Sequence, residues 1–261
     1  MFGIRPVFAL LLLPLTAPLT VPPVVTITFR DYAFDAPSTL PAGATTFHAV
    51  NAGKEPHHGL LVRLAPGKTV AELAAALAKP GPPPSWITML GGPQQGSVVT
   101  LDLTPGNYAW ICMVPGPDGA PHVMKGMIKG FVVTPNKAPA PMPAAEITAS
   151  MKDYGWDFSK PLTAGKHTVK FITAPGQPHE LVIWKLAPGK TESDLATWAT
   201  KMDSPPPGTV VGGVSPMQAG TANVVTLDLP PGHYAFFCFL PDAKDGKEHF
   251  HHGMMQDVTL R

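Results

Sequence analysis

Charged residues are scarce in this chain of 261 residues, and common catalytic motifs are missing. Only 14% of the residues are charged, against roughly 25% in typical soluble domains. The formal net charge is +1, and Lys and Arg form no block anywhere in the chain. We therefore expect no nucleic-acid partner. The sequence contains no GxSxG, HExxH or CxxC motif, so nothing supports a hydrolase, a zincin or a thioredoxin-like protein.

Long apolar runs are missing too, apart from one short run near the N-terminus. Arg5 precedes the run from Val7 to Leu13, which is the layout of a secretory signal peptide. We predict a signal peptide over residues 1–20 and a periplasmic or extracytoplasmic location. The run is far below the ~18 to 20 residues that span a bilayer. Pro18 makes a poor cleavage site after Ala17, so an uncleaved N-terminal membrane anchor stays open.

The sequence is instead rich in proline and glycine, and it repeats itself. Three segments recur in the second half of the chain: DYAFD at Asp31 as DYGWD at Asp153, LAPGKT at Leu64 and at Leu186, and VVTLDL at Val98 and at Val224. A Pro/Ala-rich stretch, residues 135–145, separates the copies and is typical of an extended, poorly packed linker. We therefore predict two domains, residues 24–134 and 146–261.

Each copy has the pattern of a β domain with one helix. Short segments that alternate or run apolar, such as VVTITF, TTFHAV, GLLVRL, SVVTLDL and KGFVVT, are bounded by Pro, Gly or Asn. One helix in each copy is indicated by capping-box spacing, with Thr69 before Glu72 and Thr191 before Asp194. The fold class that follows is all-β, with two tandem β-sandwiches that each carry a short helical insertion.

Side chains that bind soft metals recur in both copies. The motifs PGNYAWIC and PGHYAFFC place a Cys on the same strand face as two aromatic residues, which by itself is more typical of a core. A His and a Met follow each Cys with the same spacing between them, and a further His after a Pro opens an upstream strand. The two sets are His57, Cys112, His122 and Met127, and His179, Cys238, His249 and Met254. Two imidazoles, one thiolate and a distant thioether suit a blue copper site, so we predict about two copper ions per chain.

PGNYAWIC followed by His and GM, together with NAGKEPH, resembles the cupredoxins of the plastocyanin, azurin and nitrite reductase group. The resemblance extends over both repeats. It implies Greek-key β-sandwiches with one type 1 copper at the end of each, bound by the two sets above. The loop from Cys to His is similar to the type 1 loop of copper nitrite reductases. We expect an exported electron carrier that exchanges electrons with a redox partner protein through the exposed edge of a His ligand.

Two alternative functions remain. A periplasmic copper chaperone or buffer would use the same donors without a constrained redox site. Copper nitrite reductases and laccase-like oxidases add a second kind of copper, which needs a His directly before the type 1 Cys and paired HxH motifs. Here Ile111 and Phe237 hold the preceding positions, and HxH occurs once, at His249 and His251. We therefore expect that the protein is not an enzyme. A disulfide between Cys112 and Cys238 would require equivalent positions of the two repeats to touch, and is not favoured.

Further His and Met residues lie beside the predicted ligands. We interpret His58, His251 and His252 as surface residues, with a loading site for copper or a set of alternative ligands as the other interpretations. Met124 and Met255 neighbour the axial candidates and could replace them.

Overall fold

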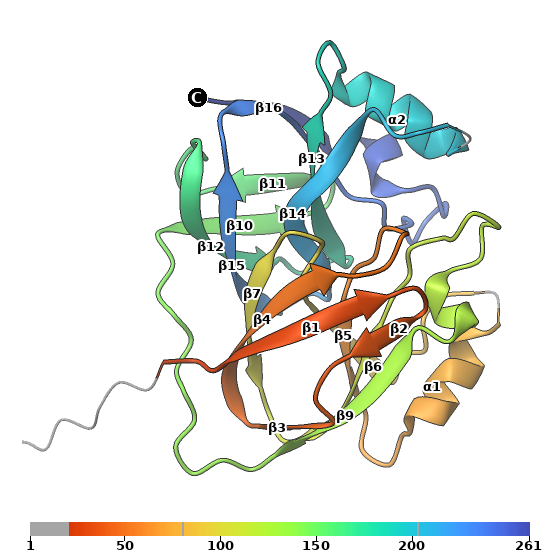
Figure 1. Cartoon of the computed structure of the whole chain (residues 1–261), viewed down its shortest axis with the longest axis vertical. Coiled ribbons are helices and arrows are strands. Elements are labelled where there is room, and N and C mark those ends of the chain that lie inside the picture. Colours follow the sequence, from red (N-terminus) through yellow and green to blue (C-terminus); the bar gives the residue numbers. More distant parts are fainter. Residues whose placement is uncertain (1–20, 80, 203) are drawn as a thin grey trace, which may run out of the picture.

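The computed structural model describes residues 21–79, 81–202 and 204–261, which Figure 1 shows from red to blue. The predicted signal peptide, residues 1–20, lies outside the described residues. Among the helices of the described part, none combines the length and the apolar character that crossing a bilayer requires.

Both repeats consist mainly of strands. The first repeat contains β1 (Val24–Arg30), β2 (Ala33–Asp35), β3 (Thr39–Pro41), β4 (Gly43–Asn51), β5 (Leu60–Leu64), α1 (Val70–Leu77), β6 (Ile87–Gly91), β7 (Val98–Leu103), β8 (Gly106–Ile111), the 3-10 helix η1 (His122–Lys125) and β9 (Ile128–Thr134). The second contains β10 (Ile147–Lys152), β11 (Gly155–Phe158), β12 (Gly165–Thr173), β13 (His179–Leu186), α2 (Glu192–Lys201), β14 (Gly208–Met217), β15 (Ala222–Leu229), β16 (Gly232–Phe237), the 3-10 helix η2 (His249–His252) and β17 (Met255–Leu260). The expected all-β fold class with one short α-helix in each repeat is confirmed.

The two α-helices begin where the capping boxes predicted. The Thr69 side chain accepts the backbone N–H of Glu72, whose carboxylate accepts the backbone N–H of Thr69. Thr191 and Asp194 make the same pair of bonds at the start of α2. Each box satisfies N–H groups that the first helical turn leaves without a partner.

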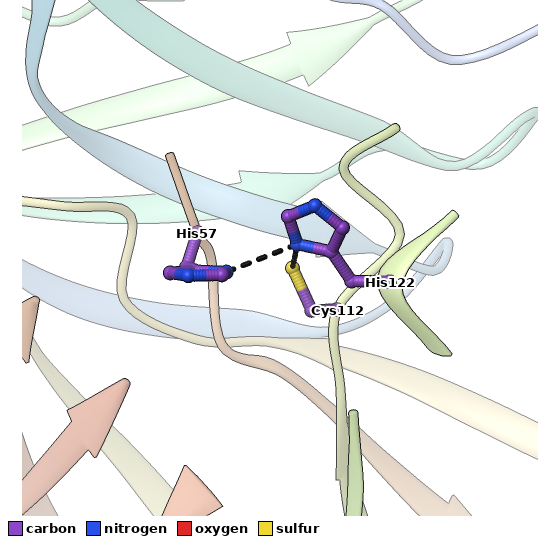
Figure 2. A group of neighbouring side chains, drawn as sticks. All are labelled: His57, Cys112 and His122. Carbon is purple, nitrogen blue, oxygen red and sulfur yellow. Dashed lines mark hydrogen bonds between the residues drawn. The ribbon is translucent and has the colours of Figure 1, made fainter. Parts of the chain in front are cut away.

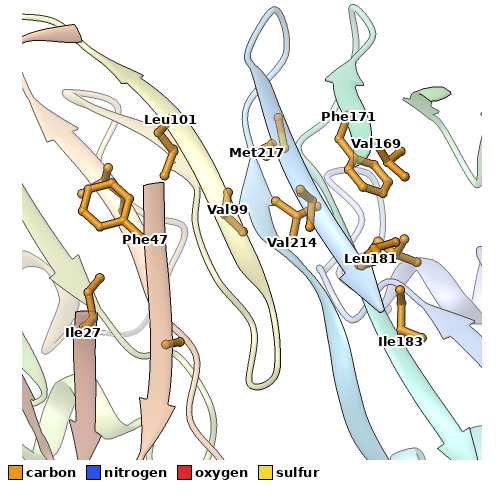
Figure 3. Close-up of a cluster of buried hydrophobic side chains, with 14 of the residues drawn as sticks. Ile27, Phe47, Val99, Leu101, Val169, Phe171, Leu181, Ile183, Val214 and Met217 are labelled. Atoms are coloured by element: carbon orange, nitrogen blue, oxygen red, sulfur yellow. The ribbon is translucent and has the colours of Figure 1, made fainter. Parts of the chain in front are cut away.

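Alternation along the strands builds the core between the sheets. In β1, Ile27 and Phe29 are fully buried while their neighbours are partly or fully exposed. Figure 3 shows the resulting cluster, to which both repeats contribute, with Val99 of β7 near Val214 of β14. β8 is buried on both of its faces, because its other face packs in the smaller cluster that contains Leu73 of α1.

Two sheets run through both repeats without interruption. One has the order β11-β10-β12-β15-β7-β4-β1-β2, and the other β17-β16-β13-β14-β6-β5-β8-β9-β3. Each repeat contributes strands to both sheets, so each is a two-layer sandwich, and Figure 1 shows the two sandwiches side by side. The two copies of VVTLDL join the repeats, because β7 pairs with β15 in an antiparallel register that places Val99 opposite Val225. These two residues are equivalent, so the repeats meet about a local two-fold axis.

The linker is only one of the connections between the repeats. Residues 135–145 form no helix or strand and are mostly exposed. The Ala140 carbonyl nevertheless accepts the backbone N–H of Ala44 at 2.9 Å. Across the joined sheets, the Ser97 hydroxyl donates to the Gly213 carbonyl at 2.7 Å, and both residues lie away from solvent. Hydrogen-bonded strands therefore hold the repeats together, in addition to the covalent linker.

Candidate metal centres

Each predicted cysteine lies at the end of an anchored strand. The hydroxyl of Tyr108 in β8 donates to the Thr104 carbonyl at 2.7 Å, and that of Tyr234 in β16 donates to the Pro230 carbonyl at 2.6 Å. These bonds fix each strand to the turn from which it starts. Cys112 directly follows β8 and is fully buried among core side chains. Cys238 has the same position after β16.

A one-turn 3-10 helix brings the downstream His back to the Cys. In the first repeat, the Cys112 carbonyl accepts the N–H of Val123, and the His122 carbonyl accepts the N–H of Met127. The turn ends at Gly126, whose φ of 98° is a left-handed conformation that favours glycine. Gly253 ends the equivalent turn in the second repeat with a φ of 93°. The constant spacing from His to Met is therefore the length of this turn.

The axial candidates are buried beside the cysteines. The backbone N–H of Cys112 donates to the Met127 carbonyl at 3.3 Å, and that of Cys238 donates to the Met254 carbonyl at 3.2 Å. Both methionines are fully buried, whereas Met124 is 52% exposed. Burial in the same apolar cluster as Cys112 thus favours Met127 over Met124 as the axial candidate.

An aspartate orients each upstream histidine. The Nε2 atom of His57 lies 3.1 Å from Asp31 Oδ1, and that of His179 lies 3.1 Å from Asp153 Oδ1. A carboxylate only accepts hydrogen bonds, so each Nε2 carries the hydrogen and each Nδ1 is free for a metal. These aspartates open the recurring DYAFD and DYGWD segments, but their recurrence alone did not indicate a role for them.

The first cluster consists of His57, Cys112 and His122, and its donor atoms converge (Figure 2). The Nδ1 atoms of the two imidazoles lie 3.0 Å apart, and His122 Nδ1 lies 3.6 Å from the Cys112 sulfur. Two nitrogens and one sulfur bound to a zinc-sized cation, at about 2.0 and 2.3 Å, would be separated by about 3 Å and about 3.5 Å. The first cluster has the spacing that such a cation needs.

The second cluster consists of His179, Cys238 and His249 and repeats this arrangement. His249 Nδ1 lies 3.4 Å from the Cys238 sulfur. His179 Nδ1 is buried and has no hydrogen-bond partner among the described residues. A buried polar atom without a partner is costly, and a metal ion bound between these donors would remove that cost. In both clusters the donor atoms lie within 4.8 Å of one another.

Burial controls protonation in the clusters. It raises the pKa of the Cys112 thiol to about 11, and it raises the pKa of Cys238 further, with a smaller contribution from the Glu180 carboxylate. Burial likewise lowers the pKa of His122 and of His249, which keeps both imidazoles neutral. Such thiols ionise only when a cation replaces the proton, so metal uptake must release a proton at each site.

The structure corrects the interpretation of His58 as a surface residue. His58 is only 6% exposed, and its Nε2 accepts the backbone N–H of Met113 at 3.0 Å. Burial lowers its pKa to about 3, so it is a neutral acceptor. Because this bond occupies Nε2, His58 stabilises the chain directly after Cys112. His251 and His252 are exposed, as predicted.

The expectation that one His ligand exposes an edge to solvent is wrong. The four candidate histidines are at most 2% exposed. The Nε2 atom of His122 donates to Glu55 at 2.8 Å, and the Tyr32 ring packs edge-on against the imidazole with centroids 5.2 Å apart. Tyr154 packs in the same way against His249 at 5.7 Å. The Tyr of the recurring DY pair therefore covers the histidine that was expected to reach solvent.

The residues before the cysteines lie in apolar clusters under the helices and not in the two donor clusters. Ile111 and Phe237 are buried in the small apolar clusters that also contain Leu73 of α1 and Leu195 of α2. A His at either position would face an apolar layer under a helix. Both cysteines are free thiols in the structure, and each lies in its own cluster.

Comparisons with known proteins gave structural likenesses only. A scan of protein-family models and a search of curated proteins each gave no match. A reduced auracyanin from Roseiflexus castenholzii is similar at 22% identity and a TM-score of 0.31, over 45% of this chain and 99% of that one. A copper nitrite reductase from Nitrosomonas europaea is similar at 14% identity and a TM-score of 0.26, over 92% of this chain and 94% of that one. A blue copper oxidase from the same organism matches at 13% identity and a TM-score of 0.26, over 92% and 86%. Likeness of this degree says nothing about the activity of this chain.

Proposed function

We propose that this chain is an exported electron carrier that holds one type 1 copper ion in each repeat. The ligands would be His57, Cys112, His122 and Met127 in the first repeat, and His179, Cys238, His249 and Met254 in the second. Copper in such a donor set supplies a one-electron couple between Cu(I) and Cu(II). The protein would deliver electrons to a redox partner protein in the periplasm or another extracytoplasmic compartment.

One observation carries the proposal. In the first cluster, both Nε2 atoms donate to carboxylates, so the two Nδ1 atoms face each other at 3.0 Å, next to a thiol. Two facing lone pairs repel unless a proton or a metal ion lies between them. The soft thiol and the two imidazoles select a copper-like cation for that place.

The surroundings of the clusters favour a carrier over a chaperone. A chaperone passes its metal on by ligand exchange, which needs ligands that a partner can reach, and the candidate ligands here are buried. An electron needs only a short covering layer. Glu55, 22% exposed at its side chain, lies one hydrogen bond from His122, and its carboxylate also accepts the Tyr32 hydroxyl at 2.7 Å. Glu55 and Tyr32 thus connect the first cluster to the surface.

Metal analysis with a visible spectrum tests the proposal. The purified full chain, loaded with copper and freed of excess, should contain about two copper ions and show an intense visible absorption that a reductant bleaches. A colourless protein with two copper ions would identify a buffer or chaperone. A copper content near zero under copper-replete conditions would overturn the assignment of both clusters.

An activity assay addresses the enzyme alternative. Because no His precedes either cysteine, we expect no reduction of nitrite and no oxidation of phenols above that of free copper ions. Turnover by the copper-loaded chain that the Cys112→Ser/Cys238→Ser variant lacks would replace the carrier with an enzyme.

A further inference from the structure

A separate group of donors lies in the loop between Cys238 and His249 and at the end of η2. Asp242, Asp245 and His252 bring one donor atom each within 4.8 Å of one another. His252 Nε2 lies 3.2 Å from Asp245 Oδ1, and the His252 ring packs against Tyr154 with centroids 5.1 Å apart. Asp242 is 3% exposed, whereas the other two residues are accessible from solvent. We call this group the loop cluster.

The first repeat has an ion pair at the same place. The Gly116 N–H donates to the Ala120 carbonyl as the Asp242 N–H donates to the Lys247 carbonyl, so Gly116 is equivalent to Asp242. Lys125 occupies the fourth position of η1, as His252 does in η2. Its ammonium group lies 2.7 Å from Asp118. The second repeat has His252 in place of Lys125 and Asp242 as an additional carboxylate, while the exposed Lys247 ammonium lies no closer than 4.0 Å to Asp245.

A buried polar atom faces the loop cluster without a partner. His249 Nε2 is buried, lies 3.9 Å from Asp242 Oδ2 and makes no hydrogen bond within the described part of the chain. A water bound to a cation at Asp242 would offer this N–H an acceptor.

Asp242 has capacity left for such a cation. Its carboxylate accepts hydrogen bonds from the Tyr154 hydroxyl, the Gln177 amide and the Lys244 N–H. A carboxylate has about four acceptor positions, so one position remains. The three hydrogen bonds hold the carboxylate in place for a ligand.

We propose that the loop cluster binds one divalent late transition-metal cation, Zn²⁺ or Cu²⁺, through Asp242, Asp245 and His252. One imidazole and two carboxylates form a donor set that such cations accept, and a thiolate is not required. The site is distinct from the second cluster in its donors and in its access to solvent. Among the described residues these three donors come together in the second repeat and not in the first, and the site does not depend on the proposed electron-carrier function.

Calorimetric titration with Zn²⁺ tests the site. In the copper-loaded full chain, Zn²⁺ should bind with a stoichiometry near one. His252→Gln and Asp245→Asn should each weaken this binding at least tenfold, since even residues that only support ligands change metal affinity by about 10- to 100-fold. Asp118→Asn, the matched change in the first repeat, should leave Zn²⁺ binding unchanged. The same titrations on Cys112→Ser/Cys238→Ser should show the same dependence on His252, which separates this site from the copper assignment.

Transfer of the site to the first repeat gives an independent test. Gly116→Asp/Lys125→His adds two donors to Asp118 and so recreates the set of three. A Cβ at Gly116 would collide with the Lys125 ammonium, which the variant removes, and would lie 3.3 Å from Asp118 Oδ1. The variant should bind a second Zn²⁺. Absence of Zn²⁺ binding by the parent chain, or binding that survives both His252→Gln and Asp245→Asn, would overturn the proposal.

Discussion

The two repeats meet the same structural demand with opposite chemistry. The residue after the upstream His is His58 in the first repeat and Glu180 in the second. Each accepts the backbone N–H of the residue after the Cys, with His58 bonding Met113 and Glu180 bonding Phe239, both at 3.0 Å. Both side chains are more than nine-tenths buried. Both repeats therefore provide an acceptor for a buried N–H, which is an imidazole in the first and a carboxyl group in the second.

The carboxylates over the downstream histidines differ in the same way. Glu55, two residues before the upstream His, accepts from His122, whereas the equivalent Gln177 leaves that position to Asp242 from another loop. Asp242 lies 3.9 Å from His249, too far for a hydrogen bond. His122 is therefore held more firmly than His249. The first cluster should be the more rigid of the two.

Removal of one cysteine should have the largest effect on copper binding, and it tests whether the two clusters bind copper separately. Each donor set comes from one repeat, although the sheets are shared. Cys112→Ser should lower the copper content from about two to about one and leave roughly half of the visible absorption, because serine lacks the soft thiolate. Cys238→Ser should give the complementary spectrum. Loss of all copper in either variant would mean that the two repeats share a site.

The aspartates at the upstream histidines should have the next largest effect. Asp31→Asn and Asp153→Asn keep the shape of the side chain but remove the charge that makes the imidazole more basic. Each change should weaken copper binding at its own site about 10- to 100-fold and raise the reduction potential of that site, since a less basic ligand stabilises Cu(II) less. Titration with a copper chelator and a redox titration measure the two effects.

The exposed Asp35, which forms a surface ion pair with Arg30, provides the control for these two aspartates. Asp35→Asn should leave both the affinity and the potential unchanged. A potential that does not move in Asp31→Asn would reduce Asp31 to a purely structural residue.

Opposite pH dependences should distinguish His58 from Glu180. Burial lowers the pKa of His58 from 6.5 to about 3 and raises that of Glu180 from 4.5 to about 7. Between pH 4.5 and 6.5 the native state binds fewer protons than the unfolded state at His58, so this residue makes stability rise with pH. At Glu180 the native state binds more protons, so stability falls as pH rises. Each contributes a slope of at most about 1.4 kcal/mol per pH unit, and in the parent chain the two oppose each other.

Urea unfolding of the metal-free chain between pH 5 and 6.5 measures these slopes. Relative to the parent, His58→Gln should make the free energy of unfolding fall more steeply with rising pH, because the Glu180 contribution is left unopposed. Glu180→Gln should do the reverse. Glutamine can accept the same backbone N–H in both places. A variant whose pH profile is parallel to that of the parent would show that the group it replaces has the same pKa in the native and unfolded states.

The repeats made much of this architecture predictable. Strands followed from alternation, both helices followed from their capping boxes, and the recurrence of Cys, His and Met at fixed spacing indicated the donors. Asp31 and Asp153 recurred just as faithfully, but nothing local connects them with histidines 26 residues further along the chain. Glu55 and Asp242 come from different segments, so comparison of the repeats could not match them.

The burial of His58 and the partner of β7 could not be predicted from the sequence. His58 lies in a polar-looking segment, NAGKEPHHG, and its buried hydrogen bond comes from the N–H of Met113, in the loop after Cys112. The pairing of β7 with β15 was equally hidden, since a strand of VVTLDL carries no mark that its partner is its own copy.

Gln94 connects the two repeats and should give the smallest effect. It belongs to the first repeat, forms an isolated bridge with His58, and its amide donates to Glu180 of the second repeat at 3.4 Å. Gln94→Ala removes a long hydrogen bond to a buried carboxyl group. We therefore expect the free energy of unfolding to fall by an amount near the lower end of the range of about 0.5 to 1.5 kcal/mol.

Glu180 bonds the N–H that follows Cys238, so Gln94→Ala should change the visible spectrum of the second site and not that of the first. The Cys112→Ser background isolates the spectrum of the second site. Gln95→Ala is the control, because the Gln95 side chain accepts only from Asn51 of its own repeat. A spectrum unchanged by Gln94→Ala would mean that the two sites are joined by the sheets without sensing each other through this contact.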